Sequence, residues 1–179
     1  MAAPGSATVL LSIIELPHLV AGGSEAEQPV ARILLMEDDL DQGEMLAELL
    51  NGAGHIVFHF MDGHSSLEFL GRNKVDIILT DVLVKQDGHH IADGGIKLIS
   101  TLRQIRRVKP NQLPIVAMSG GLAIPGGTSP LQLARDVGAD ALFEKPVPID
   151  ELLLTINELL ADVQRHRSQA PRPDSRPVF

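Results

Sequence analysis

The run Val75-Asp76-Ile77-Ile78-Leu79-Thr80-Asp81 is nearly continuous in aliphatic residues and ends in an acid. Such a run is typical of a parallel-sheet strand that is buried on both faces. Three further apolar runs also lead to polar residues: residues 31–36 to Glu37-Asp38-Asp39, residues 113–118 to Ser119-Gly120, and residues 141–143 through Glu144 to Lys145-Pro146. Ligands of open parallel sheets bind outside the carboxyl ends of the strands, so the four runs together predict a binding site.

Strand-like and helix-like segments alternate along the chain. Strands are predicted at residues 32–37, 55–60, 75–80, 114–118 and 141–143. Helices are predicted at residues 40–50, 65–71, 95–108 and 130–137, and a last helix is predicted to begin at Asp150, which would be its N-cap. This alternation predicts an α/β fold with a doubly wound, five-stranded parallel sheet in the order 2-1-3-4-5. Strands one and three are neighbours in that order, so Asp38 and Asp81 are expected to converge between them.

The composition divides the chain into three parts. Residues 1–30 are predicted to be an N-terminal extension and linker, because residues 21–29 are rich in Ala, Gly, Ser, Pro and Glu. Within it, the apolar residues 9–20 leave two alternatives, an extra helix or strand packed on the body or one packed on a second copy. Residues 31–166 are predicted to be the folded domain. Residues 167–179 are predicted to be a disordered tail, because they are polar and rich in proline.

Composition and charge argue against several classes of protein. The net charge of −8 and the absence of Tyr and Trp argue against a nucleic-acid-binding face. The local basic group, which we interpret as the solvated face of a helix, consists of Arg103, Arg106, Arg107 and Lys109. Since there is no cysteine, there is no disulfide, thiolate zinc site or catalytic thiol. Residues 8–20 are too short to span a bilayer, and a cytoplasmic protein without membrane partners is expected.

The acids at the ends of strands one and three suit a divalent cation. Two carboxylates about 4 Å apart repel each other by about 4 kcal/mol at an effective dielectric constant of about 20, so a cluster either holds protons or binds a cation. Oxygen ligands with room for water suit Mg²⁺. We predict Asp38 and Asp81 as direct ligands, Glu37 as a ligand through water, and the backbone carbonyl of Leu83 as a further ligand.

The other polar groups suit the transfer of a phosphoryl group to a carboxylate. Asp81 is the expected nucleophile, forming an acyl phosphate. Lys145 is expected to pair with Asp81 and then with a phosphoryl oxygen, while Ser119 donates its hydroxyl to another oxygen and Gly120 leaves space for the incoming group. A Lys-Pro step alone is typical of a turn, but we predict a cis bond between Lys145 and Pro146, which would aim the lysine.

Four motifs together resemble the receiver domain of bacterial response regulators over residues 31–163: Ile33-Leu34-Leu35-Met36-Glu37-Asp38-Asp39, Asp76-Ile77-Ile78-Leu79-Thr80-Asp81, Pro114-Ile115-Val116-Ala117-Met118-Ser119-Gly120, and Gly138-Ala139-Asp140-Ala141-Leu142-Phe143-Glu144-Lys145-Pro146. The resemblance implies a flavodoxin-like fold, dependence on Mg²⁺, and phosphoryl transfer to Asp81 from a sensor histidine kinase or a histidine phosphotransfer protein. It also implies a phosphoacceptor that assists its own phosphorylation and dephosphorylation, rather than an enzyme with a separate substrate.

The chain departs from the receiver pattern in three places. Lys85 stands where receivers usually have proline, and residues 86–94 make the loop after Asp81 about six residues longer than usual. The loop of residues 121–129 is also long. In receivers, movement of the hydroxyl residue, here Ser119, is coupled to rotation of an aromatic residue, and Leu142 stands at the position of that aromatic residue. This coupling must therefore be altered here or carried by aliphatic packing. We interpret His89 and His90 as part of a solvated loop, with a metal site or a cover over Asp81 as alternatives.

The sequence therefore predicts a stand-alone receiver, because only a short tail follows the last helix. It is expected to signal by contact with an unknown downstream protein, through a surface around strands four and five that changes on phosphorylation. A homodimer formed through strand 4, helix 4 and strand 5 is one alternative for such a contact. The alternatives are a degenerate receiver that binds partners without phosphorylation and a metal-dependent phosphatase, against which Leu83 argues because an acid is needed at that position. Leu83 and Gly121 offer nothing to orient an attacking water, so slow self-hydrolysis is expected.

Overall fold

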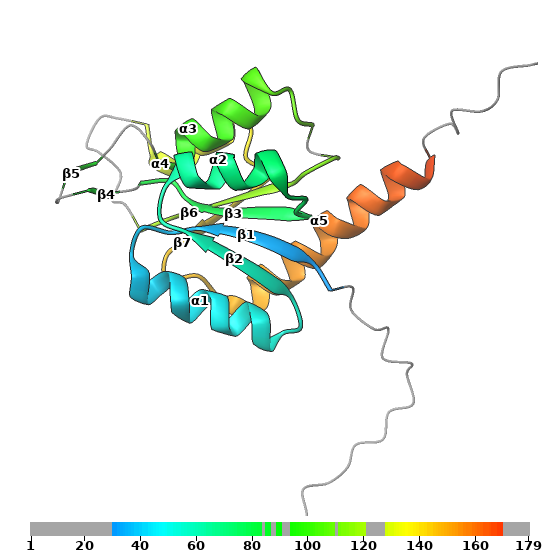
Figure 1. Cartoon of the computed structure of the whole chain (residues 1–179), viewed down its shortest axis with the longest axis horizontal. Coiled ribbons are helices and arrows are strands. Elements are labelled where there is room, and N and C mark those ends of the chain that lie inside the picture. The colour runs from blue at the N-terminus through cyan, green and yellow to red at the C-terminus, as the bar shows by residue number, and fades with distance from the viewer. Residues whose placement is uncertain are drawn as a thin grey trace, which may run out of the picture.

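A five-stranded parallel sheet forms the centre of the molecule (Figure 1). The computed structural model describes residues 30–83, 85–86, 89–90, 94–109, 111–120 and 128–169. The strands are β1 (Arg32–Met36), β2 (Ile56–Phe60), β3 (Ile77–Asp81), β6 (Ile115–Ser119) and β7 (Ala141–Glu144). Their order is β2-β1-β3-β6-β7, which confirms the predicted fold class and the predicted order 2-1-3-4-5.

Helices cover both faces of this sheet (Figure 1). On one face, α1 (Leu40–Gly52) and α5 (Ile149–Gln169) pack against a core cluster that includes Leu35 and Leu79. On the other face, α2 (Gly63–Arg72), α3 (Gly95–Ser100) and α4 (Pro130–Val137) surround a second cluster that includes Leu34 and Ile78. Successive strand residues point to opposite faces, which is why an unbroken aliphatic run is needed to fill both clusters.

Side-chain caps explain where several helices begin. Asp39 accepts a hydrogen bond from the backbone N–H of Gln42 at 3.0 Å and so caps α1. Asp62 caps α2 in the same way, and this helix therefore begins at Gly63, two residues before the predicted start. The last helix begins at Ile149, so the prediction that Asp150 is its N-cap is wrong: this acid lies within the first turn.

The connection between β3 and α3 contains two short strands that the sequence analysis interpreted as loop. β4 (Lys85–Gln86) and β5 (His89–His90) pair in antiparallel fashion, with Lys85 opposite His90. Two-residue strands carry no readable alternation of apolar and polar residues, so a pattern of this kind cannot be detected in the sequence.

The predicted helix at residues 95–108 is in fact composite. The α-helix α3 ends at Ser100 and continues as a π-helix, η1 (Thr101–Ile105), in which Arg106 N–H donates to the Thr101 carbonyl at 2.9 Å. The helical segment ends there, and Arg107 has a φ of 54°, in the left-handed region. A π-helix adds one residue to a turn and is rare, so apolar spacing alone predicts an ordinary α-helix.

Arg103 lies in this π-helix and is not part of a solvated basic face. Its guanidinium forms an ion pair with Asp140 at 2.5 Å, and its side chain is only 8% exposed. It also donates to the carbonyls of Gly138, Val108 and Leu113 at 2.9 to 3.1 Å. The basic-face interpretation is therefore wrong for Arg103, while the other three basic residues of that group are exposed. This ion pair and these hydrogen bonds lie near the amino ends of β6 and β7.

The described part of the chain extends α5 beyond the predicted domain boundary. The helix runs through Gln169, so residues 167–169, predicted as the start of a disordered tail, are helical. Residues 170–179, and the predicted N-terminal extension except its last residue, lie outside the described residues. Among the helices that the structure describes, none is long and apolar enough to cross a membrane.

Candidate functional site

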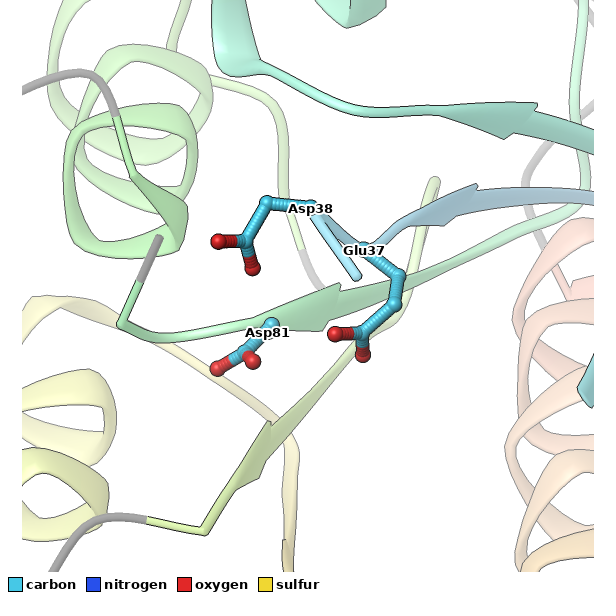
Figure 2. A group of neighbouring side chains, drawn as sticks. All are labelled: Glu37, Asp38 and Asp81. Atoms are coloured by element: carbon cyan, nitrogen blue, oxygen red, sulfur yellow. The ribbon is translucent and has the colours of Figure 1, made fainter. Parts of the chain in front are cut away.

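Three carboxylates meet at the carboxyl ends of two neighbouring strands. Glu37 and Asp38 follow the last residue of β1, and Asp81 is the last residue of β3. Figure 2 shows their side chains gathered in one region, and one oxygen of each lies within 4.8 Å of the others. We call these three residues the acid cluster. The structure thus brings together the acids that the sequence predicted to converge, because β1 and β3 are adjacent and parallel.

Asp81 is held by several hydrogen bonds. One carboxylate oxygen, Oδ1, accepts from the backbone N–H of Leu83 at 2.9 Å, and the other, Oδ2, accepts from Lys145 Nζ at 2.6 Å. The backbone carbonyl of Asp81 accepts from the hydroxyl of Thr80 at 3.0 Å. The residue is only 6% exposed. These hydrogen bonds therefore fix the direction of the Asp81 carboxylate, which lies beside the carboxylates of Glu37 and Asp38.

Lys145 bridges two members of the acid cluster. Its ammonium lies 2.5 Å from Glu37 Oε2 and 2.6 Å from Asp81 Oδ2, so the predicted pairing with Asp81 is confirmed and a second pairing with Glu37 is added. Burial alone would lower the pKa of Lys145, but its hydrogen bonds to Asp81 and Glu37 outweigh burial and raise it above the usual value. The lysine therefore stays charged and supplies the one cation of this arrangement among the described residues.

Glu37 is the most perturbed acid of the cluster. Burial raises the pKa of Glu37 from 4.5 to about 7, although Lys145 pulls in the opposite direction. The side chain is almost fully buried, and its Oε1 has no hydrogen-bond partner among the described residues. A buried carboxylate with one unsatisfied oxygen is costly unless a cation or proton joins it.

These observations fit a divalent cation with oxygen ligands. Asp38 and Asp81 would be the direct ligands and Glu37 would contribute through its unsatisfied oxygen, since carboxylates and waters are the ligands that Mg²⁺ prefers. Asp39, the third acid of the run, is occupied as the cap of α1 and turns to Gln42 instead. The ligand role predicted for the carbonyl of Leu83 stays a prediction, because the contact seen for this residue is made by its N–H.

The hydroxyl and lysine segments lie at the ends of the next two strands. Ser119 is the last residue of β6 and is 3% exposed, and its carbonyl accepts from Lys145 N–H at 3.0 Å. The peptide bond between Lys145 and Pro146 is cis, as predicted. A Cβ added to Gly120 would lie 3.5 Å from Lys145 Cβ, which is ordinary contact, so no atom of the described residues requires glycine there. The space that Gly120 provides for an incoming group stays a prediction.

Leu142 occupies the face of β7 that points toward α4. It is paired in register with Ala117 and packs, partly buried, with the cluster that contains Ala134 of α4. The neighbouring Phe143 belongs to the opposite cluster, beside α5. The aromatic ring of this strand is thus on the wrong face to replace Leu142 in a switch with Ser119, which supports aliphatic packing as the route that this chain uses.

Two residues near the site were missed by the sequence analysis. His59 of β2 places Nε2 2.8 Å from the carbonyl oxygen of Glu37. Gly95, the first residue of α3, approaches the backbone of Asp81 so closely that an added Cβ would lie 2.1 Å from its carbonyl oxygen. A lone histidine in a strand and a glycine after a loop carry no signal of such contacts, which depend on how β2 and α3 pack against the strand ends.

Several predicted features lie outside the described residues. They include the loop of residues 121–127 with Gly121, and the side chains of Lys85, His89 and His90. The alternatives for the two histidines therefore stay predictions.

The comparisons with known proteins agree with this geometry. The family model of the response regulator receiver domain matches residues 33–157. The chain is 30% identical over 129 residues to the response regulator MprA of Mycobacterium leprae (strain TN), an alignment that covers 72% of this chain and 50% of the relative. It is 27% identical over 139 residues to the transcriptional regulatory protein RprY of Bacteroides fragilis (strain YCH46), covering 77% and 52%. The chain thus spans about half the length of the curated relatives that it matches.

Solved structures show the same fold. A putative response regulator from Chloroflexus aurantiacus J-10-fl is 26% identical, with a TM-score of 0.62, and the match covers 74% of this chain and 99% of that one. A CheY-like response regulator receiver domain protein from Methanospirillum hungatei JF-1 also has a TM-score of 0.62, at 20% identity, covering 77% and 99%. The second likeness, at this identity, concerns the fold.

Proposed function

The chain belongs to the response regulator receiver domain family, and from this premise we propose that it accepts a phosphoryl group on Asp81 in a reaction that depends on Mg²⁺. The observation that carries the proposal is the double contact of Lys145 with Asp81 and Glu37 inside the acid cluster. A carboxylate that is fixed in direction, flanked by acids for a cation and paired with a permanent ammonium, is suited to in-line attack on phosphorus.

The proposed donor is a phosphohistidine of a sensor kinase or of a histidine phosphotransfer protein. An oxygen of Asp81 forms the new O–P bond while the P–N bond of the donor breaks, and the donor imidazole leaves with the electron pair. When bound, Mg²⁺ neutralises charge on the phosphoryl oxygens. Lys145 exchanges its bond to Asp81 Oδ2 for one to a phosphoryl oxygen, and the Ser119 hydroxyl donates to another.

The consequence of phosphorylation is proposed to be a changed surface. The added group carries about −1.5 to −2 charges and draws Ser119 and Lys145 toward it. Leu142, packed against the α4 side, is placed to follow that movement by a change in aliphatic packing. The proposed output surface comprises β6, α4, β7 and α5, which is also where a homodimer would form, and its partner is a protein of unknown identity.

Further parts of the proposal come from the sequence. They are a location in the cytoplasm and a phosphoryl group that hydrolyses slowly. The side chain of Leu83 packs with an apolar cluster, which supports slow hydrolysis because it offers no group to orient a water. The apolar side chain of Leu83 also weighs against a metal-dependent phosphatase, which would need an acid at this position. The second candidate, a degenerate receiver, has no specific observation in its favour, since the acid cluster and Lys145 are in contact.

The test is a measurement of intact mass after incubation with acetyl phosphate and Mg²⁺. We expect wild-type protein to gain the mass of one phosphoryl group, Asp81→Asn to gain none, and chelation of Mg²⁺ to abolish the gain. Asp41→Asn is the matched control, because it makes the same change at an exposed position of α1 and should be phosphorylated like wild type. A gain that survives in Asp81→Asn overturns the assignment. If acetyl phosphate is refused, absence of transfer from phosphorylated kinases and phosphotransfer proteins as well supports the degenerate receiver.

A further inference from the structure

The backbone of Glu37, at the start of the acid pair, is held from the edge strand β2 by two hydrogen bonds. Its N–H donates to the carbonyl of Phe60 at 2.9 Å, and its carbonyl oxygen lies 2.8 Å from Nε2 of His59. A carbonyl oxygen can only accept, so His59 Nε2 carries the hydrogen and donates it. The first bond continues the ladder of the parallel sheet, whereas the second is made by a side chain and is specific to this histidine.

The carbonyl that His59 contacts belongs to the peptide that joins Glu37 to Asp38. The orientation of this peptide is set by ψ of Glu37 and φ of Asp38, the two backbone torsions that place the two acidic residues relative to each other. One of these side chains bonds Lys145 through Oε2 at 2.5 Å, and both belong to the group of oxygens that lie within 4.8 Å of one another. The geometry of the acid cluster therefore depends on a peptide whose orientation His59 fixes.

A glycine of α1 makes room for the imidazole. A Cβ added to Gly43 would lie 2.2 Å from both Cε1 and Nε2 of His59 and 3.0 Å from Nδ1, so the ring lies directly against the helix backbone. Glycine is a poor residue for the interior of a helix, and Gly43 is buried in the second turn of α1. The ring thus fills the place that any other side chain at this position would need.

The register of the sheet explains why His59 points to this place. His59 is paired with Leu35 of β1, and Leu35 belongs to the core cluster beneath α1. Residues in register on adjacent strands point to the same face, so the imidazole must lie between β2 and α1. The contact with Glu37 follows because β1 ends one residue after Leu35 and its next peptide passes the ring.

We propose that His59 is a positioning residue for the cation site, holding the Glu37–Asp38 peptide so that both carboxylates face Asp81. The proposal rests on the proposed Mg²⁺ site and adds a residue to it. Groups that orient metal ligands typically change metal affinity by about 10- to 100-fold when they are removed. A purely structural histidine would instead affect stability and leave the affinity of the folded protein for Mg²⁺ unchanged.

The experiment measures Mg²⁺ affinity of the full chain by titration calorimetry, together with the rate of phosphorylation by acetyl phosphate. We expect His59→Leu to weaken Mg²⁺ binding by about tenfold or more, and His59→Gln, which keeps an N–H donor near the same place, to stay within about threefold of wild type. At saturating Mg²⁺ the phosphorylation rate of His59→Leu should approach that of wild type. The matched control is His64→Leu, the same change at an exposed position of α2.

A second variant guards against a failure of His59→Leu to fold. Gly43→Ala keeps the histidine but places a Cβ against the ring, and alanine favours the helix. We expect it to weaken Mg²⁺ binding as His59→Leu does. Affinities of His59→Leu and Gly43→Ala within twofold of wild type, or an equal loss in His59→Gln, would overturn the role of His59 alone. Wild-type protein that binds no Mg²⁺ would overturn the proposed function and this inference together.

Discussion

Gly95 offers a sharp test of how closely α3 controls Asp81. A Cβ at this position would lie 2.1 Å from the Asp81 carbonyl oxygen and 2.7 Å from Thr80 Oγ1, while Gly95 itself is buried at the start of α3. Backbone cannot yield as a flexible side chain does, so Gly95→Ala must push α3 and the end of β3 apart by about 1 Å.

The expected loss has two parts. Overpacking of this kind costs about 1–3 kcal/mol, which for a domain of this size lowers the melting temperature by roughly 3–10 °C. A misplacement of reacting groups by about 1 Å lowers the rate of a positioned reaction by up to about 100-fold. We therefore expect Gly95→Ala to lose phosphorylation of Asp81 by acetyl phosphate far beyond what its lower stability explains, when both are measured well below the melting temperature.

Gly71→Ala is the matched control for this change. Gly71 lies in the last turn of α2 and is exposed, and an added Cβ would meet nothing within 4 Å. The same substitution is expected there to be neutral or to stabilise the protein by about 0.4–1 kcal/mol. If Gly95→Ala matched Gly71→Ala in both melting temperature and phosphorylation rate, the close approach of α3 to Asp81 would be refuted.

Three further perturbations have expected outcomes. Lys145→Met should tighten Mg²⁺ binding by about threefold or more in titration calorimetry, because the ammonium competes with the cation for Glu37 and Asp81, and it should slow phosphorylation; weaker binding would contradict this. Arg103→Met should lower the free energy of unfolding by about 3–5 kcal/mol in chemical denaturation, because it leaves the buried Asp140 carboxylate without its ion-pair partner. Mg²⁺ affinity should be unchanged, since the acid cluster lies at the other end of the strands; a loss of stability below about 1 kcal/mol would argue against the importance of this ion pair. Burial lowers the pKa of His55 from 6.5, so the folded state binds fewer protons there than the unfolded chain does, and the free energy of unfolding falls as the pH drops below 6.5 and through the lowered pKa of the folded state. Wild type should therefore lose stability relative to His55→Gln between pH 7.5 and 5, and parallel curves in urea denaturation would count against this.

Much of the sheet could be predicted because its strands are specified by local pattern. The run that ends at Asp81 fills clusters on both faces, so it has to be aliphatic throughout, and the strand order follows from the alternation of elements. The convergence of Asp38 with Asp81 then follows from topology alone. The pairing of Lys145 with Asp81 was predictable from chemistry, since a buried acid needs a counter-charge.

Features that depend on packing between elements could not be predicted. The π-helix of residues 101–105 has the same apolar spacing as an α-helix, and the ion pair of Arg103 joins segments 37 residues apart. Likewise, nothing in the local sequence around His59 indicates that its ring meets the carbonyl of Glu37, because the contact requires both the register of β2 and the glycine in α1. The start of α5 was misplaced because Asp150 resembles a cap but lies inside the first turn.

The bond between Lys145 and Glu37 joins residues 108 positions apart, and the bond to Asp81 spans 64. Synthesis delivers all three acids of the cluster long before β7 and the lysine that directly follows it. Until β7 leaves the ribosome and adds to the edge of the sheet, the nascent chain holds an acid cluster without its ammonium. In the proposed function, the chain thus becomes competent to receive a signal only after Lys145 has been synthesised and β7 has joined the sheet, and a product truncated before residue 141 keeps every acid of the cluster yet stays silent.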